Sequence, residues 1–418
     1  MKKIVITLAC LIQFGFVNAQ SVTLDQCQDF TRANYPVLRQ MDFLQEISDL
    51  NQENLKTNYL PNLNLNGQIT YQSDVTSIDL PIPNIDIPEV SKDQYKIYLE
   101  LKQSIWDAGL TEASKDIEEV ARTIGLKQVE IELFALRQQL NDAFFMNLLI
   151  SSNIQQLNES RMMLNASMKV IESGFRNGVI EENNVDQLKA ELLLLDQKLV
   201  EMNSAKETML SMLSMFTAQK FDSNTNFEIP EVSIVHEKSF KRPEFEFLSQ
   251  NQLRLDKMDA LKTKTRLPQL FGFGQAGYGK PGLNMLKSEF DVYYLVGLGM
   301  SWNVFDWKKT KKERQIIGLK KQIIDTQKQE LEFRLNMLLD RNLKEIGKLE
   351  KLLLTDSELV ELRKKISNRS ASKLKNGTIT SADYLQDVNA ETTAKINLET
   401  RKLKLIEAII MYNTTKGL

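Results

Sequence analysis

Side chains that commonly carry catalysis or bind transition metals are scarce in this sequence. Its 418 residues include one histidine, His236, and two cysteines, Cys10 and Cys27. A metal site built from several histidines is therefore impossible, and a catalytic triad would depend on His236 alone. We predict no catalytic residues, no cofactor, no metal site and no enzymatic activity.

Residues 272–277 follow the glycine spacing of a dinucleotide-binding loop. In that motif the loop opens a helix whose N-terminus holds the pyrophosphate. Here the chain runs on through residues 278–281, Tyr-Gly-Lys-Pro, without the required helix. We interpret these glycines as sites of close approach or bending within a strand.

A second chemical signal is a basic cluster formed by Lys308, Lys309, Lys311, Lys312 and Arg314. It lies where a predicted helix follows a predicted strand. Such a cluster suits contact with anionic lipid headgroups, and it is also typical of a solvated helix start. Both interpretations stay open at this stage.

Charge and composition favour a folded, helix-rich chain. Lys and Arg number 53 against 55 Asp and Glu, and this balance argues against a nucleic-acid partner. The abundance of Lys, Glu, Leu and Gln indicates long helices. After residue 19 no stretch of about 18 apolar residues occurs, so we expect no transmembrane helix.

The first 19 residues predict a secretory signal peptide. Lys2 and Lys3 form a positive segment, residues 4–17 are mostly apolar, and Ala19 ends a small-residue cleavage site. The chain is therefore expected to leave the cytoplasm. Its one remaining cysteine excludes an internal disulfide, so packing must stabilise the fold.

The rest of the sequence contains one pattern twice. Pro61 and Pro268 lie 207 positions apart, whereas Gly178 and Gly377 lie 199 positions apart. The difference is explained by a longer loop in the first copy, at residues 73–93. A single length change within a constant register indicates a true repeat. We predict a signal peptide at 1–19, a first repeat at 20–219, a linker at 220–239 and a second repeat at 240–418.

Each repeat predicts a helix, two strands and two long helices. Alternation of apolar and polar residues is typical of half-buried strands. Near 109–176 and 308–375 the chain runs for 68 residues without proline, which is about 100 Å of helix. From Leu188 to Phe216 apolar residues recur at steps of four and three, broken only at Lys206, as in a coiled coil. The predicted elements are β-hairpins at 59–105 and 267–305 and long helices at 109–176, 181–219, 306–376 and 381–415.

Four strands are too few to close a membrane barrel, which needs about eight. An open sheet would expose unpaired edges, which lipid does not tolerate. We therefore expect three chains to pool their strands. The predicted fold class is mainly α with a small β part. A long antiparallel coiled-coil α-barrel would be joined to four β-strands per chain, which contribute to a trimeric 12-stranded outer-membrane β-barrel.

This duplicated order resembles the TolC family of outer-membrane export ducts over essentially the whole mature chain. The most specific marks are the segments 59–63 (Tyr-Leu-Pro-Asn-Leu), 106–109 (Trp-Asp-Ala-Gly), 175–180 and 374–379. The resemblance implies a passive homotrimer in the outer membrane of a Gram-negative bacterium, extending into the periplasm and in contact with outer-membrane lipid. It implies a periplasmic adaptor (membrane fusion) protein and an inner-membrane transporter of RND, ABC or MFS type, in efflux or type I secretion.

The resemblance also implies that the helical tips contact the adaptor. Asn-Gly pairs are equally explained by turn chemistry alone, so this role is a hypothesis. The tip residues are Phe175, Arg176, Asn177, Gly178, Val179, Ile180, Leu374, Lys375, Asn376, Gly377, Thr378 and Ile379.

A periplasmic entrance gate is implied just after the second tip. Asp383 takes the first acidic position of the family pattern, Gln386 replaces an acid at the second, and Asp387 is adjacent. Three copies of Asp383 around an axis would favour cations. Thr380 and Asp383 also fit a capping box at a helix start, and the two roles are compatible.

Two other classes of function were weighed. A periplasmic coiled-coil scaffold, or an adaptor-like protein that does not span the membrane, explains the heptads. It does not explain four alternating strands that recur in register. A hydrolase that uses surface carboxylates is disfavoured because no catalytic groups cluster in the sequence.

Overall fold

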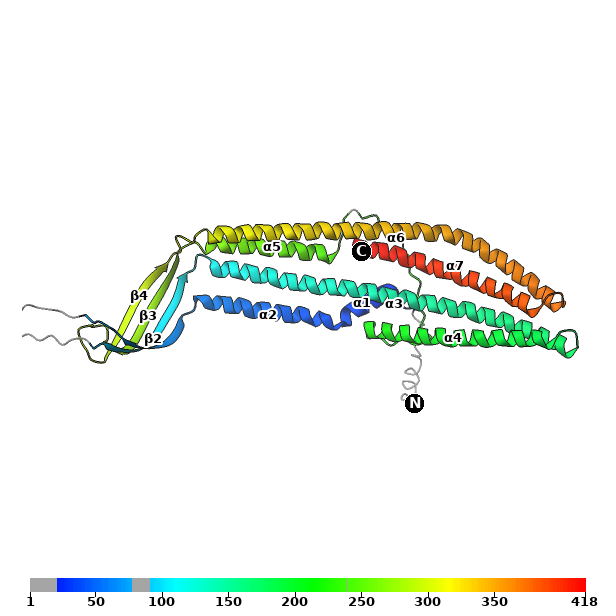
Figure 1. Cartoon of the computed structure of the whole chain (residues 1–418), viewed down its shortest axis with the longest axis horizontal. Coiled ribbons are helices and arrows are strands. Elements are labelled where there is room, and N and C mark those ends of the chain that lie inside the picture. Colours follow the sequence, from blue (N-terminus) through cyan, green and yellow to red (C-terminus); the bar gives the residue numbers. More distant parts are fainter. Residues whose placement is uncertain (1–20, 77–90, 238) are drawn as a thin grey trace, which may run out of the picture. The chain divides into compact units, whose positions relative to one another are not determined.

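The computed structural model describes residues 21–76, 91–237 and 239–418. The predicted signal peptide at 1–19 and residues 77–90 of the predicted long loop lie outside the described residues. Figure 1 shows the order of the elements. They are α1 (Leu24–Asn34), η1 (Pro36–Leu38), α2 (Arg39–Lys56), η2 (Thr57–Tyr59), β1 (Asn62–Tyr71), β2 (Asp93–Trp106), α3 (Leu110–Arg176), α4 (Glu182–Thr217), α5 (Pro243–Lys264), β3 (Gln269–Lys280), β4 (Asp291–Ser301), α6 (Lys309–Lys375) and α7 (Ser381–Lys416).

The fold is mainly helical with one small sheet, which confirms the predicted class. The two longest helices, α3 and α6, have 67 residues each, and the return helices α4 and α7 have 36 each. The second hairpin was predicted to reach residue 305, but β4 ends at Ser301. Ser301 pairs with Gln269, the first residue of β3, so the residues that follow have no partner strand.

Contacts divide the chain into two compact units, and each draws on both sequence repeats. The strand-containing unit comprises Gln40–Gln128 and Glu244–Gln329. The tip-containing unit comprises Val129–Pro243, Glu330–Leu418 and the residues up to Arg39. The helices α3 and α6 each begin in the first unit and end in the second.

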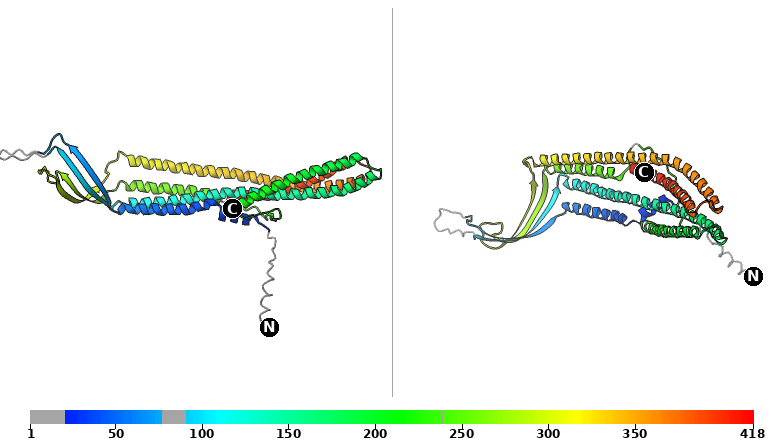
Figure 2. Two further views of the ribbon diagram at one scale, coloured as in Figure 1. Left: turned by 90° about the horizontal axis from the view of Figure 1, so that it is seen from below. Right: turned by 45° about the vertical axis from the view of Figure 1, so that its right-hand side comes forward.

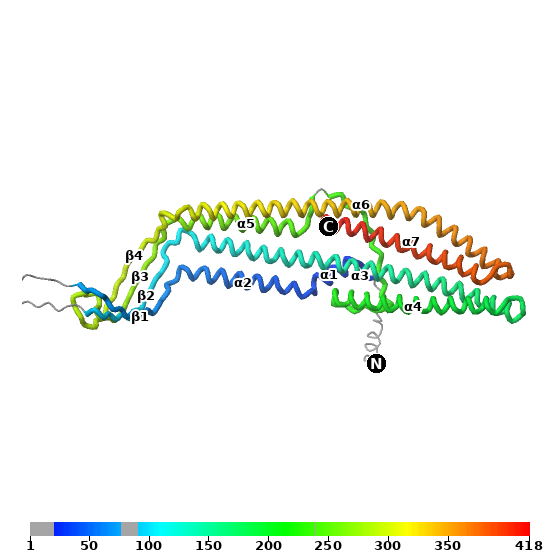
Figure 3. Tube along the Cα trace, viewed as in Figure 1, coloured from blue at the N-terminus to red at the C-terminus, as the bar shows by residue number. Residues whose placement is uncertain are grey.

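In the strand-containing unit the four strands form one antiparallel sheet in chain order, β1-β2-β3-β4 (Figure 3). The register places Leu65 opposite Leu99 and Gly274 opposite Val296, so the alternating apolar residues of β1, β2 and β4 share one face. On that face β3 presents mostly small residues, whereas Phe271 and Phe273 lie on the opposite face, where the Lys102 ammonium group is 4.5 Å from the Phe271 ring. On this opposite face Glu100 accepts hydrogen bonds from Asn66 (3.4 Å) and Gln275 (3.0 Å). The predicted apolar face is therefore present on β1, β2 and β4, whereas β3 contributes mainly glycine and alanine to it.

Helices leave the sheet through two equivalent turns. The Asp107 carboxylate accepts the backbone N–H of Thr111 at 2.7 Å, and Asp306 accepts that of Thr310 at 2.9 Å. Each aspartate therefore caps the first turn of a 67-residue helix and satisfies backbone groups that would otherwise lack partners. The Tyr59 hydroxyl also donates to Asp107, at 2.8 Å, which ties the start of the hairpin to its end.

Side-chain pairs join the helices that flank the sheet. Arg314 of α6 binds both carboxylate oxygens of Asp259 in α5, at 2.9 and 3.0 Å. Asn51 of α2 donates to Glu118 of α3 at 3.0 Å. The helices of this unit are thus paired α2 with α3 and α5 with α6.

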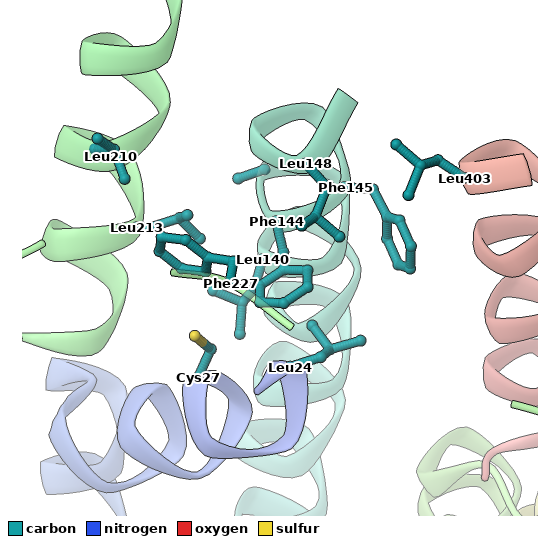
Figure 4. Packing of buried hydrophobic residues seen from close by; sticks show 11 residues of the cluster. Leu24, Cys27, Leu140, Phe144, Phe145, Leu148, Leu210, Leu213, Phe227 and Leu403 are labelled. Carbon is teal, nitrogen blue, oxygen red and sulfur yellow. The ribbon is translucent and has the colours of Figure 1, made fainter. Parts of the chain in front are cut away.

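The main core of the tip-containing unit packs α1, α3 and α4 together (Figure 4). Phe144 is fully buried and makes edge-to-face contacts with Phe145 and Phe227, at ring-centroid distances of 6.0 and 5.5 Å. Phe227 belongs to the segment predicted as a linker. Cys27 is buried in the same cluster, and burial raises the pKa of its thiol to about 12, so it stays a protonated packing residue.

The long helices of this unit form antiparallel pairs (Figure 2). Arg161 of α3 binds Asp196 of α4 at 2.8 Å, and Arg401 of α7 contacts Asp356 of α6. The predicted seam on α4 is buried or half-buried along its length. Lys206, the residue that interrupts it, instead donates its ammonium group to the carbonyl oxygen of Ser223 at 3.1 Å.

Candidate functional site at the helical tips

The two tips are built by the same helix-ending turn. At the first, the N–H of Gly178 donates to the carbonyl of Phe175 (2.9 Å) and that of Val179 to Gly174 (3.0 Å). Gly178 has a φ of +72°, and its counterpart Gly377 has a φ of +67° with equivalent bonds. This is a Schellman motif, which uses glycine because other residues are strained there. The turn chemistry of the backbone therefore accounts for the glycine of each Asn-Gly pair.

We expect Gly178→Ala to loosen the first tip by about 1 kcal/mol, because an L-residue is strained at positive φ although the space beside it is open. Limited trypsin cleavage after Arg176 should then become faster than in the wild-type chain. Gly347→Ala is the matched control, because it lies inside α6 with equally open space. Equal cleavage of the two variants would show that the turn does not depend on glycine.

Each tip has a buried side and an exposed side. Ile180 and Ile379 pack against a core cluster from all four long helices, and Leu374 is only 4% exposed. Phe175 and Val179 point outward and are 42% and 75% exposed. The structure thus places part of the predicted contact set in the core. An apolar pair at the first tip is left available to a partner.

Hydrogen bonds fix the two hairpins to each other beside the tips. The hydroxyls of Ser167 in α3 and Tyr384 in α7 are 2.8 Å apart, and the backbone N–H of Ser381 donates to Asn184 at 2.8 Å. Burial raises the pKa of the Tyr384 phenol. These residues were not predicted from the sequence, where their one local signal is that Tyr384 shares an apolar helix face with Val388.

The predicted gate residue Asp383 caps α7. Its carboxylate accepts the Thr380 hydroxyl at 2.7 Å and the Thr380 N–H at 3.1 Å, while its own N–H donates to the same hydroxyl at 3.2 Å. These bonds from Thr380 lower the pKa of the exposed Asp383 carboxyl. The pKa of the Asp383 carboxyl is lower in the folded chain than in the unfolded chain. The cap therefore stabilises α7 fully at pH values above the ordinary carboxyl pKa. That stabilisation is lost as pH falls through the lowered value.

The other two gate candidates lie one turn further along α7. Gln386 is exposed, whereas Asp387 is half-buried and accepts the Ser370 hydroxyl of α6 at 2.5 Å. Asp387 therefore joins α6 to α7, and the structure shows a tertiary contact for it that sequence spacing could not indicate. Asp383 is the candidate whose charge faces solvent.

The described ranges, 21–76, 91–237 and 239–418, contain neither a metal-binding cluster nor a membrane-spanning helix. Among these residues no group of three His, Cys, Asp or Glu side chains could hold a metal ion. No helix in the same ranges combines the length and apolar character needed to cross a membrane.

The similarity of this chain to known proteins lies in its structure. No protein-family model matches the sequence, and no curated protein matches it significantly. The outer membrane protein VceC of Vibrio cholerae superposes with a TM-score of 0.67 at 12% identity, covering 94% of this chain and 96% of that one. The Campylobacter jejuni outer membrane channel CmeC gives a TM-score of 0.66 at 15% identity, covering 94% and 85%. The open state of the Neisseria gonorrhoeae outer membrane channel MtrE gives 0.64 at 13%, covering 94% and 88%.

These matches span nearly the whole of both chains in each pair and agree with the duplicated order of helices and strands. They confirm, at the level of the fold, the resemblance that the sequence motifs indicated. The chain has the fold of the TolC-like outer-membrane channels.

Proposed function

We propose that this protein is the passive homotrimeric outer-membrane channel of a tripartite efflux or type I secretion system. Substrates would pass from a periplasmic adaptor and an inner-membrane transporter of RND, ABC or MFS type, through the trimer, to the outside of a Gram-negative cell. The observation that carries this proposal is the exposed apolar face of the four-stranded sheet.

That face is too large and too continuous for a protein surrounded by water. On β4, Val292, Tyr294, Val296 and Leu298 are 76%, 79%, 77% and 81% exposed. On β1, Ile69 is 77% exposed. Soluble monomers rarely leave apolar patches of this kind uncovered, whereas lipid covers them without cost.

The edges of the sheet support assembly into a trimer. In the described sheet β1 pairs only with β2, and β4 pairs only with β3. Both edges therefore present unpaired backbone groups, which hydrocarbon does not tolerate. Three chains with four strands each would pair every edge and close a barrel of twelve strands. The polar face with Glu100 would then line an aqueous duct.

The tips support a role in partner contact and entry. Phe175 and Val179 of the first tip offer an exposed apolar contact for an adaptor, and Asp383, just after the second tip, places a carboxylate in solvent. Gln386 and Asp387 would flank that carboxylate on α7. Because the proposed channel is passive and has no catalytic group, the energy for transport would come from the inner-membrane transporter.

The proposal is tested by fractionation and conductance. We expect heat-modifiable trimers in the outer-membrane fraction, and ion conductance when the purified trimer is added to planar bilayers. A soluble monomer in the periplasm, with no conductance, would favour the coiled-coil scaffold instead.

At the entrance we expect Asp383→Asn to raise leak conductance and weaken block by multivalent cations, because it removes the charge and keeps an oxygen that Thr380 can bind. Asp383→Ala, which also removes the cap, is expected to do the same and to loosen the start of α7. Unchanged conductance and block in Asp383→Asn would leave Asp383 with the capping role only.

A further inference from the structure

The turn into α6 carries an unusual group of side chains, here named the basic–aromatic cluster: Phe305, Trp307, Lys308, Lys309, Lys311 and Lys312. All six are exposed, with Trp307 at 81% and Phe305 at 67%. The two aromatic rings meet edge to face with centroids 4.9 Å apart. The cluster lies in the strand-containing unit, between the end of β4 and the first turn of α6.

The first repeat shows what this turn needs for folding alone. At the position of Phe305 it also has an aromatic residue, Trp106, but at the other five positions it has small, apolar or acidic residues, and Asp107 makes the same cap as Asp306. The replacements, from first to second repeat, are Ala108 by Trp307, Gly109 by Lys308, Leu110 by Lys309, Glu112 by Lys311 and Ala113 by Lys312. The turn therefore forms without the cluster.

The four lysines lie where the local electrostatic potential is unfavourable to positive charge. A helix N-terminus carries a partial positive charge and favours acids, yet the first turn of α6 has no acidic residue, whereas that of α3 has Glu112. Within the described part of the chain, none of the four lysines forms an ion pair. The nearby acids are engaged elsewhere, since Glu313 binds Lys262 at 3.1 Å and Asp259 binds Arg314.

The backbone is also strained at this point. Trp307 and Lys308 have φ values of +52° and +62°, where Ala108 and Gly109 have +59° and +78°. A bulky residue in the left-handed region is disfavoured, and glycine would relieve it. Trp307 gains little from its own chain in return, because it is mostly exposed. A large aromatic at a strained and exposed position indicates a function outside the chain.

A hollow of about 670 Å³ adjoins the cluster between α5 and α6. Its lining includes four cationic side chains, Arg266, Lys311, Arg314 and Lys321. Asp259 and Asp256 neutralise Arg314 and Lys321 respectively. Arg266 interacts electrostatically with the Asp306 carboxylate, whereas Lys311 has no ion-pair partner in the described structure, so the hollow keeps an excess of positive charge that suits an anionic group.

We propose that the basic–aromatic cluster binds the phosphates of anionic phospholipids in the leaflet that adjoins the helical side of the sheet. This inference rests on the proposed function, since it requires the sheet to lie in a membrane. Trp307 and Phe305 would sit at the level of the headgroups, as aromatic belts do. The lysines would then contact the negatively charged lipid headgroups, which take the place of the acidic partners that they lack in the described part of the chain. Only the second repeat carries the cluster, so each trimer would have three such sites.

The test uses the full mature trimer, reconstituted in bilayers of equal parts phosphatidylcholine and phosphatidylglycerol and then re-extracted in mild detergent. Native mass spectrometry of the retained lipids should show roughly tenfold enrichment of phosphatidylglycerol, given the attraction of several lysines to anionic lipid. Replacing all four lysines by Gln should abolish the enrichment, and replacing them by Arg should preserve it. The matched control neutralises four exposed lysines without ion pairs elsewhere on α6, namely Lys320, Lys328, Lys351 and Lys364.

Enrichment that persists in the four-Gln variant, or is lost equally in the control, would overturn the inference. So would displacement of the lipid by millimolar inorganic phosphate, which would indicate a free-anion site. If the trimer inserts and conducts but shows no lipid preference, only this inference fails. If the chain never inserts into the bilayer, the proposed function fails with it.

Discussion

Ile69→Lys is expected to abolish stable insertion of the trimer into the outer membrane. Ile69 is 77% exposed on the apolar face of β1, opposite Tyr95. A lysine facing lipid costs up to about 2–4 kcal/mol in each chain, depending on its depth in the bilayer, and the proposed trimer would carry three. The measurement is the amount of heat-modifiable trimer in the outer-membrane fraction, with conductance of any purified product.

Gln68→Lys is the matched control, because the neighbouring residue on the same strand faces the polar side of the sheet. There a lysine would meet water, so trimer yield should stay near the wild-type level. The pair also separates the channel from the soluble scaffold. In a protein surrounded by water, lysine at an exposed isoleucine position would be harmless, so equal yields for both variants would contradict the membrane assignment.

Phe144→Ala is expected to destabilise the tip-containing unit by about 3–5 kcal/mol, because it removes a fully buried aromatic side chain and leaves a cavity. Phe144 contacts Phe145 of α3 and Phe227 of the inter-repeat segment, so its loss should also release that segment. The midpoint of thermal unfolding, followed by helical circular dichroism, measures the first effect. Hydrogen exchange around Phe227 measures the second.

Met146→Ala provides the comparison on the same turn of α3. Met146 is 47% exposed, so its truncation should change the free energy of unfolding by less than about 1 kcal/mol. A similar midpoint for the two variants would show that the Phe144 cluster does not hold the unit together. If Phe144→Ala lowers stability without faster hydrogen exchange near Phe227, contacts other than that with Phe144 hold the inter-repeat segment in place.

The repeat allowed much of the secondary structure to be predicted from sequence. Steps of two in the strands and of three and four in the helices depend only on which face of one element is apolar. The two proline-free stretches accordingly become α3 and α6, of equal length. The capping box at Thr380 and Asp383 was also visible, because its residues are three positions apart.

Contacts between distant segments could not be predicted in this way. Ser167 and Tyr384 are 217 positions apart, and neither residue type indicates the other. Phe227 was assigned to a linker because residues 220–239 lie between the two copies of the repeat, yet it is 8% exposed in the main core. In the second hairpin the amphipathic pattern continues beyond Ser301. The strand β4 nevertheless ends at Ser301, because β3 begins at its partner Gln269 and offers no further residue to pair with.

The sequence by itself determined the helices, the strands, the apolar face of β1, β2 and β4 and the twofold repetition, since these follow from local periodicity and from motifs that recur along the chain. Only the tertiary structure decided that Asp387 joins α6 to α7, that Leu374 lies in the core while Phe175 does not, and that Trp307 and Lys308 occupy positions suited to glycine. These features depend on which elements pack together and on the backbone path between them. Packing is set by complementary surfaces far apart in the chain, and local patterns carry little information about it.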